Sequence, residues 1–257
     1  SYSLANQPAA GDAGTLRWEF GDITNPPSND GTPVDDLMIV YVAKVVTDAA
    51  PVGIPHDSNI LRDNSATLSY TGGDPAAFPN RLTASATIDV RQPQMSPVRK
   101  VDLAADRLGT GTLADPYQVN IGTDQMQFRL SSCNAGLAPA YGVVLTDLLA
   151  AELDESDLTA SPPVGKIGTT VLEAGTDYTY SAPTRGGEMR IALLDGAPVN
   201  PGECVTVDYD IGFHTDLTVS KSWRNQARLQ EYRSLPPSEP GRFYTSTERA
   251  EVWMTHL

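Results

Sequence analysis

The chain has 257 residues, of which 40% are hydrophobic and 19% are charged, so it has enough apolar material for a folded core and is not disordered throughout. Lys and Arg number 18 against 32 Asp and Glu, a formal net charge of −14, which disfavours binding to the phosphate backbone of nucleic acids. No apolar run in the sequence is long enough to span a membrane as a helix.

Alternation of apolar and polar residues with period two dominates the chain and predicts short strands. Gly and Pro number 21 and 20, and their clusters separate the strands as turns. The predicted strands are, in chain order, residues 15–20, 37–45, 66–70, 82–90, 126–130, 141–145, 189–193, 204–211, 227–232 and 250–254. One helical segment is expected at residues 148–158, which are rich in Leu, Ala and Glu. The sequence therefore predicts an all-β chain.

Two copies of one ordered pattern follow each other along the chain. Residues 64–68 and 225–229 both read Asn-x-Ala-x-Leu, and the strand at 37–45 corresponds to the strand at 204–211, with Tyr41 matching Tyr209. In each copy a Pro-containing loop and a last strand follow the Asn motif. The second copy has a long segment ahead of its matching strands, and the first has a much shorter one.

The first copy therefore has the pattern of the C-terminal half of a module, residues 1–94, and the second copy that of a complete module, residues 95–257. A half module exposes an apolar sheet face and an unpaired strand edge. Either the chain is cut from a longer tandem array, or a neighbouring subunit supplies the missing strands by β-augmentation. The sequence leaves both explanations open.

The second copy carries motifs in the order of a known family. The strand at residues 125–130 is followed by the turn Asn134-Ala135-Gly136, by a strand that ends in Thr146-Asp147, and by the closing motif at 225–229. This order resembles the conserved-repeat domain of bacterial surface proteins, the "domain of unknown function eleven" type. It implies immunoglobulin-like β-sandwich modules in tandem. One departure is the missing proline after Asp147.

The resemblance also implies a function, a non-enzymatic structural module of a secreted or surface-anchored bacterial protein. Such a module acts as a stalk, adhesin or filament subunit, and its partners are neighbouring modules or identical subunits. The alternative is an adhesin tip that recognises a glycan or a host protein. The residues themselves give no support for an enzyme, because His56, His214 and His256 lack metal-site spacing and no Gly-x-Ser-x-Gly motif occurs.

A related group, the fimbrial isopeptide-forming domains, is similar in layout. In that group a Lys on the first strand, an Asn on the last and an acidic residue between them form an intramolecular amide bond. The matching positions here are Lys100, Asn225 and Asp147. The chemistry needs a desolvated, neutral amine and a buried carboxylic acid that polarises the Asn carbonyl and moves protons, the catalytic role that falls to Asp147. The alternative is a surface lysine and a turn asparagine.

The chain has two cysteines, Cys133 and Cys204, near the end of one predicted strand and the start of another. The extracellular setting that the resemblance implies favours a disulfide between them, and two reduced, buried thiols are the alternative. No cofactor is expected. Acidic runs at 152–157 and 35–36 offer the hard oxygen ligands that suit calcium, but they lack EF-hand spacing, and a solvated acidic face is the alternative.

Overall fold

The computed structural model describes residues 4–6, 8–9, 15–21, 39–41, 60–69, 81–104, 106–216, 222–239 and 241–256. The chain divides into two compact units, Ser1–Val45 and Val46–Leu257. The module boundary predicted after residue 94 stays a prediction. In the described part of the chain, no helix is long and apolar enough to cross a membrane.

The described strands before residue 95 form two antiparallel pairs. In the first unit β1 (Leu4–Asn6) pairs with β2 (Glu19–Phe20), which is the end of the strand predicted at 15–20. In the second unit β3 (Ile60–Ser69) pairs with β4 (Arg81–Val90) along their full length. The strand predicted at 37–45 lies mostly outside the described residues, and its described part, 39–41, is not in a strand.

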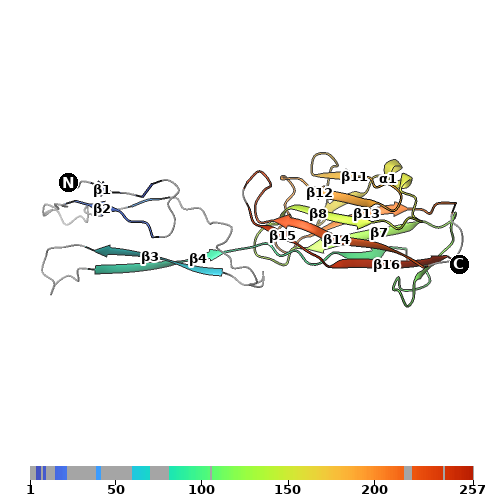
Figure 1. Ribbon diagram of the computed structural model, residues 1–257, viewed down its shortest axis with the longest axis horizontal. Coiled ribbons are helices and arrows are strands. Elements are labelled where there is room, and N and C mark those ends of the chain that lie inside the picture. The colour runs from blue at the N-terminus through green and yellow to red at the C-terminus, as the bar shows by residue number, and fades with distance from the viewer. Residues whose placement is uncertain are drawn as a thin grey trace. The chain divides into compact units, whose positions relative to one another are not determined.

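The remainder of the second unit is a sandwich of two sheets (Figure 1). The five-stranded sheet has the order β10-β9-β13-β7-β5, made of β5 (Arg99–Asp102), β7 (Met126–Cys133), β9 (Val164–Ile167), β10 (Thr170–Val171) and β13 (Cys204–Ile211). The seven-stranded sheet has the order β11-β12-β8-β14-β16-β6, with β15 paired to β14. Its strands are β6 (Tyr117–Val119), β8 (Tyr141–Leu148), β11 (Tyr178–Ser181), β12 (Glu188–Leu193), β14 (Trp223–Arg233), β15 (Phe243–Thr245) and β16 (Arg249–His256).

The core lies between these two sheets, because alternate residues of a strand point to opposite faces. On β13 the buried residues are Val205, Val207, Tyr209 and Ile211, the face predicted from the alternation of the sequence. β7 buries every second residue as well, from Met126 onward. The side chains of both sheets join in one continuous hydrophobic cluster. The predicted all-β fold is therefore confirmed.

The helix predicted at 148–158 is wrong in its extent. Leu148 still belongs to β8, which is paired on one side with β12 and on the other with β14. The helical segment is the short α1 (Ser156–Ala160). At Leu148, strand pairing on both edges outweighs helix propensity, which contributes only a few tenths of a kcal/mol per residue, up to ~0.7. Residues 149–155 form turns and one isolated bridge, between Leu153 and Phe213.

Candidate functional site

Four polar side chains from opposite sheets meet in the core of the sandwich. Lys100 on β5 and Tyr209 on β13 come from the five-stranded sheet, and Asp147 on β8 and Asn225 on β14 come from the seven-stranded sheet. Asp147 lies opposite Ala227, two residues along β14 from Asn225, so both side chains share the inward face. The structure thus brings together the three residues that the sequence singled out, Lys100, Asp147 and Asn225.

The phenol of Tyr209 links the cluster. Lys100 Nζ donates hydrogen bonds to Asp147 Oδ2 and to Tyr209 Oη, the latter at 3.0 Å. Tyr209 Oη donates to Asp147 Oδ2, and Asn225 Nδ2 donates to Tyr209 Oη at 3.3 Å. One hydroxyl oxygen therefore contacts the amine, the carboxylate and the carboxamide nitrogen.

Aromatic rings close the cluster on the side of the five-stranded sheet. Lys100 Nζ lies 4.2 Å from the centroid of the Phe128 ring, and the rings of Phe128 and Tyr209 are 5.5 Å apart. The side chains of Lys100 and Asp147 have no exposed surface. A buried ion pair of this kind gains little for stability once the cost of removing both charges from water is counted, so its presence points to another role.

Burial sets the protonation of the amine and of the phenol. Desolvation lowers the pKa of Lys100 from 10.5 to about 8, although the neighbouring Asp147 pulls it upward. Burial, with the charge of Asp147 and the hydrogen bond to it, raises the pKa of Tyr209 well above 10.0. The phenol is therefore neutral at physiological pH, while a sizeable fraction of the amine carries the lone pair that a nucleophile needs.

Two oxygen atoms of the cluster are buried acceptors without a hydrogen-bond partner among the residues that the structure describes. They are Asp147 Oδ1 and Asn225 Oδ1. Leaving a buried acceptor unpaired costs about 1–3 kcal/mol. A proton on the carboxyl of Asp147 turns one of these acceptors into a donor. With that proton in place, the cluster contains the three groups that amide exchange requires, which are an amine, a carboxylic acid and a primary amide.

The disulfide lies in the five-stranded sheet. Cys133 at the end of β7 stands directly opposite Cys204 at the start of β13, and the two form a disulfide. This bond joins neighbouring strands of one sheet. Lys100 and Asn225, by contrast, lie on different sheets.

One of the two acidic runs approaches a histidine. Asp154, Glu155 and His214 each offer one ligand atom within 4.8 Å of the others. His214 Nε2 lies 2.9 Å from Glu155 Oε2, so these groups already pair with one another. The run at 35–36 lies outside the described residues. Calcium binding stays a prediction, and an imidazole nitrogen is a poor ligand for that ion.

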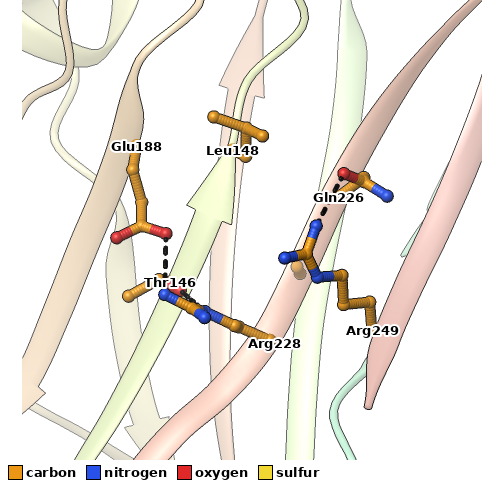
Figure 2. Close-up of a pocket in the computed structure, with 7 residues that line it drawn as sticks. Thr146, Leu148, Glu188, Gln226, Arg228 and Arg249 are labelled. Atoms are coloured by element: carbon orange, nitrogen blue, oxygen red, sulfur yellow. Dashed lines mark hydrogen bonds and ion pairs between the residues drawn. The ribbon is translucent and has the colours of Figure 1, made fainter. Parts of the chain in front are cut away.

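A shallow pocket lies on the other face of the strands that carry Asp147 and Asn225 (Figure 2). Arg228 donates to Thr146 Oγ1 at 3.2 Å and to Glu188 Oε2 at 3.3 Å, and Arg249 donates to Gln226 Oε1 at 3.3 Å. Both guanidinium groups thus pair with side chains of the pocket itself. This face is consequently a solvated polar surface.

Tyr209 is the member of the cluster that the sequence did not assign. The alternation of β13 places it on the buried face with Val205 and Val207. A phenol on the core face of a strand needs a hydrogen-bond partner, so a tyrosine at this position indicates a polar group nearby in the core. The identity of that partner depends on contacts between sheets that no local pattern shows.

No protein-family model and no curated protein matches the sequence. Among solved structures, the chain is similar to the full-length major pilin SpaD from Corynebacterium diphtheriae, at 15% identity over 83% of this chain and 64% of that chain, with a TM-score of 0.38. It is also similar to the full-length major pilin RrgB from Streptococcus pneumoniae, at 16% identity over 63% and 29%, with a TM-score of 0.43. A third similar structure is the 35 kDa C-terminal fragment of the major pilin GBS80 from Streptococcus agalactiae. Its sequence identity is 14%, the match covers 62% of this chain and 56% of that chain, and the TM-score is 0.39. The chain spans less than two thirds of the length of each of these three chains.

Proposed function

We propose that this chain is a structural module of a bacterial surface stalk or filament, stapled internally by an amide bond between Lys100 and Asn225. The observation that carries the proposal is the buried cluster in which Lys100, Asp147 and Asn225 converge on one hydroxyl. An amine, an acid and an amide meet there in the buried core, although each costs free energy to bury. Their presence is explained if they react with one another.

The reaction needs no co-reactant. The neutral amine of Lys100 attacks Cγ of Asn225, and a proton from Asp147 stabilises the negative charge that develops on the carbonyl oxygen. One proton of the lysine nitrogen passes to Nδ2, the bond between Cγ and Nδ2 breaks, and ammonia leaves as the carbonyl oxygen returns its proton to Asp147. The lysine nitrogen keeps one hydrogen in the new secondary amide. Amine and primary amide are consumed, and secondary amide and ammonia are formed, so atoms and electrons balance.

The product suits a mechanical role. The amide would connect β5 of one sheet with β14 of the other, so that force could not separate the two sheets between these points. A covalent link between distant residues also restricts the unfolded chain. The net charge of −14 would keep an extended array of such modules soluble.

Assembly of identical subunits by strand complementation extends this proposal. β3 carries the Asn-x-Ala-x-Leu motif and pairs with β4, as β14 carries it and pairs with β16. The other edge of β14 pairs with β8. A strand equivalent to β8 from a second subunit would complete the first copy in the same way.

Intact mass under denaturing conditions tests the staple. The wild-type chain, refolded and then denatured, is expected to weigh one ammonia less than its sequence after reduction, and two further hydrogens less before reduction because of the disulfide. Lys100→Met, Asn225→Ala and Asp147→Asn remove the nucleophile, the electrophile and the acid in turn, and after reduction each should have the full mass of its own sequence. Gln226→Ala, at the next position of β14 and on its outer face, is the matched control and should lose the ammonia. A folded wild-type chain of full mass would refute the proposal.

The rate of ammonia loss is expected to fall above pH 8. The reactive state has a neutral amine on Lys100 and a proton on Asp147, which together hold the same single proton as the ion pair, so the rate should be flat between pH 6 and 7. Above the pKa of Lys100, about 8, that proton is lost and the rate should fall, approaching roughly tenfold per pH unit. Chain dissolved from inclusion bodies has not assembled the cluster, so dilution from denaturant starts the reaction. Acid-quenched samples give the rate by mass. A rate that keeps rising from pH 6 to 9 would contradict the role of Asp147 as proton donor.

A further inference from the structure

We infer that the hydroxyl of Tyr209 carries a proton from the lysine nitrogen to the departing amide nitrogen while the bond forms. This inference rests on the proposed function, because it assigns a second catalytic residue to the same reaction. It leaves Asp147 the single task of protonating the carbonyl oxygen of Asn225.

The geometry places Tyr209 between the atom that must lose a proton and the atom that must gain one. Tyr209 Oη is 3.0 Å from Lys100 Nζ and 3.3 Å from Asn225 Nδ2. A hydroxyl is both donor and acceptor, so it can pass a proton between two such neighbours without a change in its own charge. Asp147 also contacts Lys100 Nζ and Tyr209 Oη, through Oδ2. Among the hydrogen bonds of the described residues, Tyr209 is the group that contacts both nitrogens.

The proton balance of the tetrahedral intermediate calls for such a carrier. After attack, Lys100 Nζ has four bonds and one proton too many. Asn225 Nδ2 is then a basic amine with a lone pair, and it must gain a proton to leave as ammonia. Tyr209 Oη accepts the first proton as it donates its own, and it ends as the neutral phenol with which it began.

The surroundings hold the phenol in the state and position that this transfer requires. Its ring is buried and packs against Phe128, which fixes the direction of the hydroxyl. The raised pKa of Tyr209 keeps the hydroxyl protonated and able to donate. The side chains of Lys100 and Asp147 have no solvent-exposed surface, and Tyr209 Oη is in direct contact with both nitrogens between which the proton moves.

Tyr209→Phe removes this hydroxyl and leaves the ring. We expect the refolded variant to lose ammonia at least about 100-fold more slowly than the wild type, the usual scale for a general acid–base group. Tyr178→Phe is the matched control, because Tyr178 is also buried and its hydroxyl donates to Pro163 O at 2.6 Å. It should react at the wild-type rate. Circular dichroism of both variants in a Lys100→Met background compares their folding without the bond.

A structural role of the hydroxyl is separated from proton transfer by a second variant. Site-specific replacement of Tyr209 by 3-fluorotyrosine keeps the hydroxyl and nearly the size of the ring but makes the phenol more acidic. A severalfold change of the rate of ammonia loss is expected, whereas a merely structural hydroxyl would leave that rate unchanged. This measurement decides the matter if Tyr209→Phe does not fold.

The outcomes of the two proposals differ. If the wild type loses ammonia and Tyr209→Phe does so equally fast, the role of Tyr209 is overturned and the staple stands. If the folded wild type keeps its ammonia, the staple and the role of Tyr209 both fall.

Discussion

Asn225→Ala should make the segment between residues 100 and 225 extensible under force. In the wild type an amide between Lys100 and Asn225 would pass tension directly from β5 to β14 and bypass the chain between them. Without the amide, unfolding under reducing conditions releases roughly 125 residues, or about 430 Å of contour length at ~3.4 Å per residue. The wild type should release none of this length.

Single-molecule pulling between the chain ends measures this difference, with Gln226→Ala as a control that should behave as the wild type does. In chemical denaturation, the free energy of unfolding of Asn225→Ala should be lower than that of the wild type by on the order of 5 kcal/mol. This is the loop-entropy value for a link across roughly 125 residues. Lys100→Met removes the amine that forms the same bond, and it should release the same contour length under force. A wild-type chain that extends fully between residues 100 and 225 would rule out the staple.

The sequence predicted the long strands and missed most of the short ones. β7 and β13 alternate clearly, since one face of each meets the core. Short strands such as β10 (Thr170–Val171) and β15 (Phe243–Thr245) are exposed at most positions. Their two or three residues leave no period to detect, and only the pairing with β9 or β14 defines them.

The site was predictable in part, for a related reason. Lys100, Asp147 and Asn225 were chosen by their order along the chain, which a resemblance of layout can give. The bridging position of Tyr209 arises because β13 and β14, in different sheets, face each other across the core, and that contact is a property of the packed sandwich. Residue order was therefore enough to select Lys100 and Asn225, the pair that we propose to react, and three-dimensional packing was needed to identify Tyr209 as the group that connects them.

The double substitution Cys133→Ala and Cys204→Ala should lower the free energy of unfolding both in the wild type and in Asn225→Ala. It should change the length released under force only in Asn225→Ala. The disulfide closes a loop with a sequence separation of 71, for which loop entropy gives about 4 kcal/mol. Denaturant titration should show a loss of this order with or without the amide, because both links restrict the unfolded chain.

Force should distinguish the two backgrounds, because Cys133 and Cys204 lie inside the segment bounded by Lys100 and Asn225. In the wild type the proposed amide would carry the force past the disulfide, so removal of the cysteines or reduction should add no length. In Asn225→Ala the disulfide becomes the remaining staple, and its loss should add about 240 Å for the 71-residue separation at ~3.4 Å per residue. If reduction lengthened the wild type as much as Asn225→Ala, the outer amide would be absent and the disulfide would be the link that resists force.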